Sequence, residues 1–415
     1  MFQSAYKARH GTETALLKVV NDILCAIDDG NVTLLTMLDL SAAFDTIDHA
    51  ILVERLKISF GINGVVLDWI GSYLSDRKQK IKIDNDVSSE IPIKYGVPQG
   101  SVLGPILFTL YTTPLSAIVR RHGLSYHFYA DDSQLYILFR PKDPVSREDA
   151  IAKVQACAED IRCWMSKNML KLNDDKTELI IITTNRENPK PSFTIRIGSD
   201  DISPASDSEP PKNLGVYIDS CLNFQAHISK VVKTINYALF NIGKTRKFLD
   251  KPTCESIING LTTSRLDYCN SLLYGANEKD LDKLQCLQNR AARILTHTPK
   301  FSHITGVMKG LHWLPVRQRI QYKILLTVFK CRSDLAPAYL VELLTPYAPT
   351  RSLRSSDKNL LEVPKTRLKT YGDRSFQVAG PILWNSLPLR LRQPMTVDAF
   401  KKELKTYLFT AAYNE

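Results

Sequence analysis

The chain lacks the features that mark membrane, secreted and zinc-binding proteins. No stretch of its 415 residues approaches the ~18 consecutive apolar residues that a spanning helix needs. The N-terminus has no apolar segment followed by a small-residue cleavage site, so the sequence gives no sign of secretion. The eight cysteines form no CxxC motif and no Cys/His cluster with zinc spacing. We therefore expect a soluble intracellular protein, nuclear or cytoplasmic, with reduced thiols and no membrane partner.

The composition is that of a globular protein with an uneven distribution of charge. A hydrophobic fraction of 44% and a charged fraction of 23% exclude wholesale disorder, collagen and coiled coil, and 415 residues suggest two or three domains. The first 220 residues carry 24 Lys and Arg against 29 Asp and Glu, whereas the remainder carries 30 against 14. This asymmetry suggests a metal site in the first part and a polyanion partner for the second. A basic surface that is merely solvated would give the same counts.

Hydrophobic periodicity predicts helices and strands mixed up to residue 220 and nearly all helix afterwards. Helices are expected over 11–30, 41–59, 64–77, 104–121, 145–169 and 394–413, and in pieces through 224–344. Strands are expected over 31–40, 177–184 and 213–219, and in hairpins within 78–97 and 125–139. Residues 185–212 and 345–380 are expected to be loops. The fold class is therefore α+β, followed by a helical part.

Three acidic residues stand where carboxylates could do chemistry. Asp39 ends an apolar strand, and Asp131 and Asp132 occupy the turn between two strands. A buried unpaired carboxylate is costly, and two adjacent acids repel each other unless water or a cation is near. Taken singly, each place is better explained as structural, Asp39 as a helix N-cap and the pair as an ordinary turn. Together, the three carboxylates would suit Mg²⁺, which prefers oxygen ligands.

Five sequence blocks surround these acids in a fixed order. They are LDLSAAFDTIDH (38–49), GVPQGSVLGPILFTLYT (96–112), FYADD (128–132), LKLNDDKTE (170–178) and LGVYID (214–219). Together they resemble the palm motifs of reverse transcriptases, specifically those of non-LTR (LINE-type) retrotransposons. The stretch QNRAARILTHTPKFSHITGVMKGLHWLPVRQRIQYKI is similar to the sequence after the palm in jockey-like elements. The resemblance covers nearly the whole chain.

The resemblance implies a right-hand polymerase, with an antiparallel palm sheet and helices, partial fingers and a mostly helical thumb. The implied domains are a fingers remnant (1–30), a palm with inserted fingers elements (31–220), a basic thumb (221–344) and an accessory region (345–415). QSAYKARHGTETALLKV (3–19) resembles the end of the family's fingers block, with Ala5, Tyr6 and Lys7 in place of the usual Gly, Phe and Arg. We expect the chain to be N-terminally truncated, without the earlier fingers strands and the endonuclease.

The resemblance also assigns catalytic roles to individual residues. Asp39, Asp131 and Asp132 would bind two Mg²⁺ ions, with Mn²⁺ as an alternative, and the Leu40 carbonyl would add a ligand. Phe44 would be the steric gate against a ribose 2′-OH, unless it is a core residue. Lys176 would lie near the triphosphate as a proton donor, unless it forms a solvated ion pair.

The remaining implied roles concern substrate binding. Gln99 and Gly100, with Gly96 and Pro98, would line the nucleotide and template pocket, and Lys7 or Arg9 would meet the incoming triphosphate. The template–primer duplex would be held mainly through phosphate and sugar. The basic residues expected to hold it, among Trp313 and Tyr322, are Arg290, Arg293, Arg317, Arg319 and Lys323.

The implied function is RNA-directed DNA polymerisation by two-metal nucleotidyl transfer, with template RNA, a DNA primer or target, and dNTPs as partners. One alternative is a nucleic-acid-binding remnant without catalysis, which would bind duplex and extend nothing. A second is a related palm enzyme, such as an intron maturase or a telomerase-like polymerase, and the C-terminal stretch argues for the retrotransposon. A nucleotide cyclase would fit the paired acids, but it leaves the PQG block and the basic tail unexplained.

Overall fold

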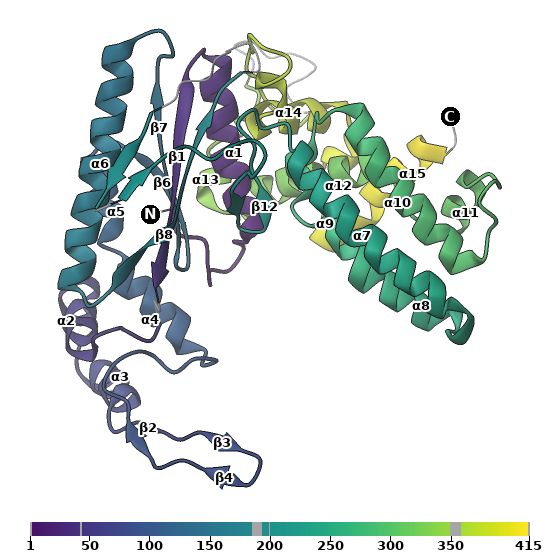
Figure 1. Ribbon diagram of the computed structural model, residues 1–415. Helices are drawn as coiled ribbons and strands as arrows, with labels where there is room; N and C mark the ends of the chain where they lie inside the picture. The colour runs from purple at the N-terminus through teal and green to yellow at the C-terminus, as the bar shows by residue number, and fades with distance from the viewer. Residues whose placement is uncertain (1, 42–43, 185–192, 199, 349–357, 414–415) are drawn as a thin grey trace. The chain divides into compact units, whose positions relative to one another are not determined.

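A four-stranded sheet with the strand order β6-β7-β1-β8 organises the first part of the chain (Figure 1). Its strands are β1 (Val32–Ser41), β6 (Ser125–Tyr129), β7 (Asp132–Phe139) and β8 (Lys171–Ile182). The structure is a computed structural model that describes residues 2–41, 44–184, 193–198, 200–348 and 358–413. It divides into two compact units, Met1–Ala8 with Thr33–Ile181 and Pro189–Ala205, and Arg9–Val32 with Ile182–Asn188 and Ser206–Glu415.

The order of apolar residues explains why the sheet forms where it does. β1 is buried along most of its length, which fits its short, continuous run of Val, Leu and Thr. β6 and β7 pair antiparallel with Tyr129 opposite Asp132, so that only Ala130 and Asp131 form the turn. Ala130 takes a positive φ of 56°, which a two-residue hairpin turn demands. The turn therefore presents both adjacent acids at one end of the hairpin.

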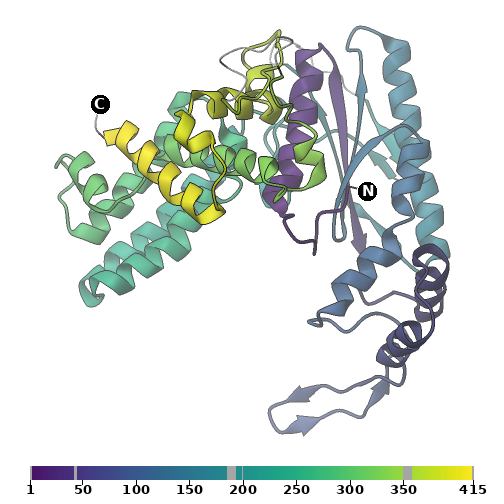
Figure 2. The ribbon, with the colours of Figure 1, turned by 180° about the vertical axis from the view of Figure 1, so that it is seen from behind.

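Helices cover this sheet and extend from it. They are α2 (His49–Phe60), α3 (Val65–Leu74), α4 (Leu103–Thr112), α5 (Leu115–Arg121) and α6 (Pro144–Lys167). Figures 1 and 2 show α5 and α6 along the same side of the sheet, and both contact its strands. The buried residues of α6, including Ala150, Val154 and Ile161, recur at helical spacing and form its inward stripe.

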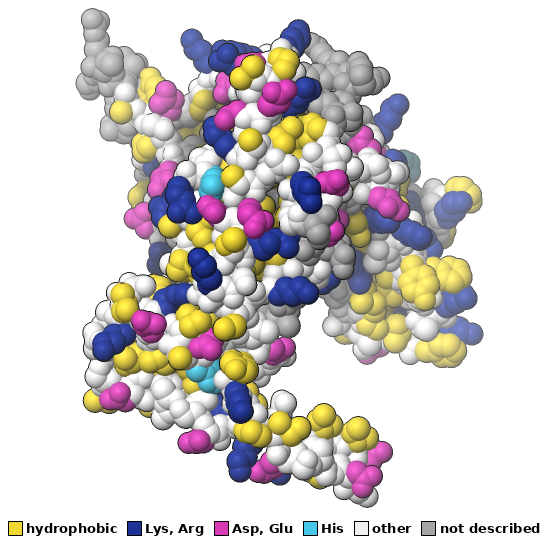
Figure 3. Space-filling model, turned by 60° about the vertical axis from the view of Figure 1, so that its left-hand side comes forward, with side chains coloured by type: hydrophobic (Ala, Val, Ile, Leu, Met, Phe, Trp, Pro, Cys, Tyr) yellow, Lys and Arg dark blue, Asp and Glu magenta, His cyan; other side chains and the backbone are white. Residues whose placement is uncertain are grey.

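A hairpin arm projects from the first unit. It contains β2 (Lys78–Gln79), β3 (Lys82–Ile83), β4 (Asp86–Val87) and β5 (Ile91–Pro92), and all of these positions are exposed. Figure 3 shows hydrophobic side chains along the arm at the bottom of the view, and Ile81, Ile83 and Ile91 are among the exposed ones. The unit also contains a small antiparallel pair, β9 (Ile195–Ile197) and β10 (Asp200–Ile202).

The second unit is almost entirely helical. Its longer helices are α1 (Thr12–Asp28), α7 (Gln225–Thr245), α8 (Lys251–Ile258), α10 (Glu278–Thr296), α12 (Val316–Arg332), α14 (Phe376–Ser386) and α15 (Val397–Tyr413). Its shorter elements are α9 (Ser264–Asp267), α11 (Thr305–Gly310), α13 (Ala338–Val341), β11 (Lys212–Asn213), β12 (Val216–Tyr217) and single turns at 246–248, 259–263, 270–273, 372–374 and 389–392. Phe329 and Phe400 stack in its core with ring centroids 4.0 Å apart, beside the buried Trp384.

The predicted α+β class with a helical continuation is confirmed, since helix and antiparallel sheet are mixed before residue 220 and helices dominate afterwards. The helices predicted over 11–30, 64–77, 145–169 and 394–413 are present with slightly different ends, as is the strand predicted over 31–40. Both predicted hairpins are present. Among the described residues, no helix combines the length and the apolar character that crossing a membrane requires.

Several predicted boundaries are wrong for identifiable reasons. The helix predicted over 41–59 begins only at His49, because Asp48 caps it by accepting a bond from Ile51 N (3.0 Å); residues 42–43 lie outside the described part. The helix predicted over 104–121 breaks at Thr113 and Pro114. The strand predicted over 177–184 begins at Lys171, so the polar block before it is part of β8.

The segments predicted as loops contain regular structure. Within 185–212, the described residues form β9 and β10, while 185–192 and 199 lie outside the description. The strand predicted over 213–219 is interrupted by a turn at residues 214–215, which joins the end of β11 at Asn213 to β12. The region predicted to be loose over 345–380 contains the start of α14, and its residues 349–357 are outside the description.

Candidate active site and nucleic-acid interface

The first unit brings the three predicted acids into one electrostatic group. β7 and β1 are neighbours in the sheet, so Asp132, the first residue of β7, and Asp39, near the end of β1, lie on adjacent strands. The pKa of Asp132 is raised to about 6, mainly by partial loss of hydration and then by the negative charges of Asp131 and Asp39, while Lys176 opposes the rise. Each of these groups therefore lies close enough to influence the others.

Lys176 supplies the positive charge at this group. Its Nζ lies 3.2 Å from Oδ2 of Asp39, and Asn173 Nδ2 lies 3.5 Å from the same oxygen. Both residues come from β8, the strand next to β1, and the block LKLNDDKTE reaches Asp39 because it is itself a strand. The Lys176 side chain is 68% exposed, so this is a solvated ion pair whose ammonium can leave the carboxylate at little cost.

The donor chemistry at this place suits a hard divalent cation. Three carboxylates offer the oxygen ligands that Mg²⁺ prefers, and their mutual repulsion, which adds to the effect of burial on the pKa of Asp132, favours a cation there. Within the described part of the chain, no three His, Cys, Asp or Glu side chains stand close enough to form a finished metal site. The three carboxylates fit a divalent cation by ligand type and charge. In this structure Asp39 forms an ion pair with Lys176.

A residue that the sequence did not single out supports the turn that carries two of the acids. Gln3 is 1% exposed, and its Oε1 accepts bonds from the backbone N–H of Ala130 (3.2 Å) and of Ala5 (2.9 Å). The segment around it joins the edge of β6, where Phe128 N donates to Phe2 O (2.8 Å) and Ser4 N donates to Phe128 O (3.0 Å). In the sequence, the only sign of such a role was that Gln3 begins the block QSAY, which resembles the end of the family's fingers block.

Backbone hydrogen bonds join the loop after β1 to the PQG block. Gly96 N donates to Ile47 O (2.8 Å) and Val97 N donates to Phe44 O (2.9 Å), while Gln99 Nε2 donates to Asp45 Oδ1 (2.8 Å). The structure therefore brings the segments of Phe44 and Gln99 together. The Phe44 ring also packs on Phe108 with a centroid distance of 4.7 Å, as a core residue would.

Glycine is required at position 96 by both backbone shape and space. Its φ is +84°, and a Cβ there would lie 2.8 Å from the carbonyl oxygen of Asp45. Gly100, also at positive φ (+78°), faces open space and is exposed. A cavity of about 630 Å³ opens beside this block, lined among others by Arg77, Lys94 and Gln99. Leu40, predicted to offer its carbonyl, is buried on β1.

The two predicted triphosphate contacts differ in their surroundings. Lys7 is exposed and follows Tyr6, whose phenol pKa is raised by partial burial and then by the charges of Asp131 and Tyr129, so Tyr6 faces the acidic turn. Arg9 belongs to the second unit, where its guanidinium donates to the backbone carbonyl of Asp334. A role for Arg9 at a triphosphate would require that bond to break.

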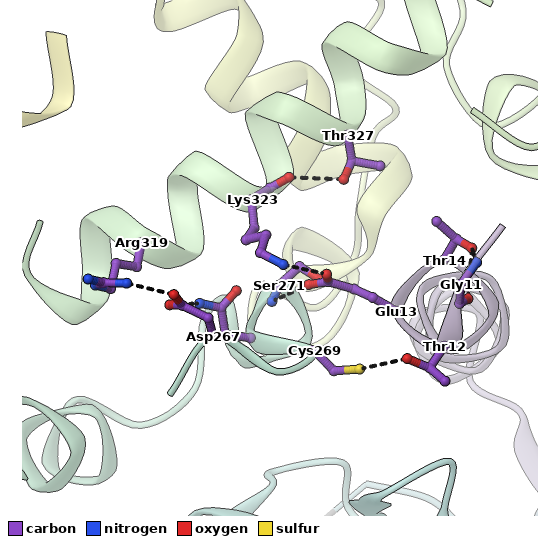
Figure 4. A network of polar contacts seen from close by, with 11 residues as sticks. Gly11, Thr12, Glu13, Thr14, Asp267, Cys269, Ser271, Arg319, Lys323 and Thr327 are labelled. Carbon is purple, nitrogen blue, oxygen red and sulfur yellow. Dashed lines mark hydrogen bonds and ion pairs between the residues drawn. The ribbon is translucent and has the colours of Figure 1, made fainter. Parts of the chain in front are cut away.

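Three of the predicted nucleic-acid contacts are neutralised by carboxylates within the second unit. Figure 4 shows two of them, with Lys323 Nζ donating to Glu13 (2.9 Å) and Arg319 donating to Asp267 (2.6 Å). Arg317 pairs with Glu278 and with Asp282 (2.9 Å). Trp313, predicted to stand among the basic contacts, is buried. This helix surface is therefore held together by its own ion pairs.

The other two predicted contacts line a groove. Arg290 and Arg293 lie on α10 and border a cavity of about 660 Å³ together with Arg246, Lys247 and Lys300. Arg290 donates to Asn236 Oδ1 (2.9 Å) and Arg293 donates to the Ser302 carbonyl (3.1 Å). Neither guanidinium has a carboxylate partner among the described residues, which separates them from Arg317, Arg319 and Lys323.

Comparison with known proteins identifies the family. The family profile described as "Reverse transcriptase (RNA-dependent DNA polymerase)" matches residues 1–218, which include the three acids and the PQG block. The chain belongs to this reverse transcriptase family. The predicted LINE-type membership is confirmed by its relatives, which are named as polymerases of non-LTR mobile elements.

Three curated relatives of this chain come from Drosophila melanogaster. It is 27% identical over 317 residues to the probable RNA-directed DNA polymerase from transposon X-element (74% of this chain, 33% of that protein). It is 25% identical over 381 residues to the probable RNA-directed DNA polymerase from transposon BS (85% and 38%), and 24% identical over 319 residues to that of mobile element jockey (75% and 33%). The chain thus spans about a third of their length. Among solved structures, apo telomerase from Candida tropicalis aligns over 81% of this chain and 55% of its own, with 12% identity and a TM-score of 0.39.

Proposed function

We propose that this chain is an RNA-directed DNA polymerase of a LINE-type element, which extends the 3′-OH of a DNA primer with dNTPs on an RNA template, in the nucleus or cytoplasm. The observation that carries the proposal is the electrostatic convergence of Asp131 and Asp39 on the carboxylate of Asp132. A polymerase of this family needs such a cluster, because the reaction moves negative charge between phosphoryl oxygens and needs positive charge to stabilise it.

Asp39, Asp131 and Asp132 would hold Mg²⁺, or Mn²⁺, with the Leu40 carbonyl as a further ligand. When bound, two such ions would lower the pKa of the primer 3′-OH and neutralise the charge of the pyrophosphate oxygens. The chain's own contribution is position and charge rather than covalent chemistry. Lys176, which pairs with Asp39 through an exposed ammonium, would give a proton to the leaving pyrophosphate.

The segments around Phe44 and Gln99 would form the nucleotide pocket. Their backbone pairing and the bond from Gln99 to Asp45 fix the PQG block beside the cavity that Arg77 and Lys94 line. In this pocket Phe44 would crowd a ribose 2′-OH, and Gly100 would allow close approach of the backbone. Lys7, which is exposed and follows Tyr6, and Arg9 are the proposed contacts to the triphosphate.

The test is primer extension on poly(rA)/oligo(dT) with Mg²⁺ and dTTP. An Asp131→Asn, Asp132→Asn double variant should lose extension by at least about 100-fold, because the charge that holds the metal is removed. Asp149→Asn, an exposed acid on α6 paired with Lys153, is the matched control and should extend normally. Equal activity of wild type and the double variant would reject the assignment of these acids.

A catalytically silent protein would give a different result in the same assay. The wild type would then bind the template–primer in a salt-sensitive manner and extend nothing with either metal, which supports the alternative of a nucleic-acid-binding remnant. Extension that also accepts ribonucleotides after Phe44→Val, and not before, would support the gate at Phe44.

A further inference from the structure

The groove on the second unit has walls that are built into the fold. It lies beside the C-terminal ends of α7 and α10, two helices that pack against each other. The Arg246 guanidinium donates to the carbonyls of Ile294 (3.0 Å) and Leu295 (3.0 Å), which belong to the last turn of α10. Arg293 in turn donates to Ser302 O and so holds the loop after α10. Both arginines therefore fix the frame of the groove.

The charge of the groove is positive and unbalanced. Its lining contains Lys247, Arg290 and Lys300 besides the two framing arginines, and none of its lining residues, all of them described, is acidic. Lys247, Arg290 and Lys300 have no ion pair with any described carboxylate, whereas Arg317, Arg319 and Lys323 each have one. Cations that border a groove without carboxylate partners are what a polyanion would require.

Exposed aromatic rings stand directly beside these lysines. Lys247 Nζ lies 4.8 Å from the ring centroid of Phe248, and Lys300 Nζ lies 5.6 Å from that of Phe301. The Phe248 residue is 78% exposed and Phe301 is 93% exposed. Phe240, one turn before Gly243 of the groove, is also exposed and carries Lys244 at 4.3 Å. Phenylalanine at such exposure has no packing role within the unit.

We propose that this groove, formed by Lys247, Arg290 and Lys300 with Phe248 and Phe301 beside it, binds single-stranded nucleic acid, with the cations on phosphates and the rings stacked on unpaired bases. Rings that alternate with unpaired cations suit a single strand, because in a duplex the faces of the bases are covered by their neighbours. An acidic protein surface would use the cations and leave the rings without a function. The inference rests on the nucleic-acid partner proposed above, but not on catalysis.

The test is fluorescence anisotropy on the full chain with a labelled 15-mer of oligouridylate, without metal ion or dNTP. The same length of oligothymidylate distinguishes RNA from DNA as the source of the strand, and an abasic 15-mer provides the phosphates without bases. Wild type should bind the uridylate or thymidylate strand at least about tenfold more tightly than the abasic strand, since each stacked base contributes to affinity.

Two pairs of substitutions separate stacking from charge. Phe248→Leu with Phe301→Leu should weaken binding of the base-containing strand by at least about tenfold and leave abasic binding unchanged. Lys247→Gln with Lys300→Gln should weaken both, with a salt slope shallower by about 1.4, as expected for two lost contacts to a single strand. Lys279→Gln, an exposed lysine at the far end of α10, is the matched control and should change nothing.

Three results would overturn the proposal. They are normal binding of the base-containing strand by the phenylalanine variant, equal loss of binding to a 15-bp duplex in that variant, and displacement of the strand by polyglutamate as effective as by unlabelled strand. The last would assign the groove to an acidic protein. Because the rings are exposed, the leucine variants should keep the wild-type circular dichroism. The Asp131→Asn, Asp132→Asn variant should bind as wild type, so failure of this proposal and failure of catalysis are separate outcomes.

Discussion

The carboxamide oxygen of Gln3 bonds to the backbone N–H of Ala130, the residue immediately before the acidic pair Asp131-Asp132. Gln3 is buried and Ala130 is half-buried, and the bond supports the turn from outside the hairpin. It means that the direction of the two carboxylates depends on a side chain that is remote in sequence. The hydrogen bonds of the Gln3 carboxamide oxygen go to backbone N–H groups and not to the three acids, so its role is to position the turn.

Replacing the oxygen of Gln3 should therefore lower both activity and stability. Gln3→Met fills the same space but accepts no bond, and it leaves the half-buried Ala130 N–H without this acceptor, at a cost of about 1–3 kcal/mol. We expect kcat for primer extension to fall about tenfold and the Mg²⁺ concentration for half-maximal rate to rise. Gln3→Glu keeps an acceptor and should restore part of kcat. Equal loss in both variants would show that Gln3 has only a packing role.

Lys176 should matter to the chemical step rather than to the stability of the fold. Its ion pair with Asp39 is exposed, so Lys176→Gln should change the free energy of unfolding by less than about 1 kcal/mol. If the ammonium donates a proton, the single-turnover incorporation rate should fall on the order of 100-fold. Lys171→Gln, exposed on the same strand, is the control. An unchanged rate in Lys176→Gln would make the lysine a surface ion pair only.

Gly96→Ala should distort the junction between the PQG block and the loop after β1. The new Cβ would face backbone at 2.8 Å in addition to the strain of a positive φ, so the loss in unfolding free energy should be about 1–3 kcal/mol. Gly123→Ala has a similar φ (+72°) with nothing within 4 Å, and it isolates the cost of φ alone. Chemical denaturation of both variants measures the difference, and equal losses would contradict the collision.

His227 should make the second unit sensitive to acid. It is buried, and its Nδ1 accepts a bond from Tyr217 N (3.4 Å), while burial lowers its pKa to about 4 from an ordinary 6.5. The unfolded chain takes up this proton below about pH 6.5 and the folded chain only near pH 4, so the stabilisation is complete above 6.5 and is lost as the pH falls towards 4. At pH 5 the loss is about 2 kcal/mol.

Hydrogen exchange of the α7 amides at pH 7.5 and pH 5, corrected for intrinsic rates, measures this loss. His227→Gln cannot take up the proton, so the difference in opening free energy between the two pH values should be about 2 kcal/mol smaller in the variant. An identical pH dependence in wild type and variant would contradict the role of His227.

Sequence patterns predicted the features that depend on neighbouring residues. Alternation predicted the hairpin that carries Asp131 and Asp132, and the apolar run before Asp39 predicted β1. The start of β8 was missed because its first part is polar, and those side chains are placed by tertiary contacts, such as Asn173 with Asp39. Local periodicity contains no information about such contacts.

The partners of the basic residues could not be predicted for the same reason. Lys323 pairs with Glu13, and Arg319 with Asp267, across long separations that no local pattern encodes. Composition shows that a region is basic, but not which cations are already neutralised. The sequence therefore predicted the same role for Arg290 and Lys323. Only the structure shows that Lys323 is paired with a carboxylate, whereas Arg290 bonds to the amide of Asn236.

The attachment of α1 has a consequence for the order in which the chain folds during synthesis. Ten residues of α1 are buried, and its Glu13 accepts bonds from Ser271 Oγ (2.7 Å) and Lys323, while Asp28 accepts from the backbone N–H of Leu368 (2.6 Å). A ribosome makes α1 first and these partners more than 200 residues later. The apolar face of α1 therefore stays exposed or bound by a chaperone until these partners have been synthesised. A nascent fragment that ends near residue 220 should aggregate.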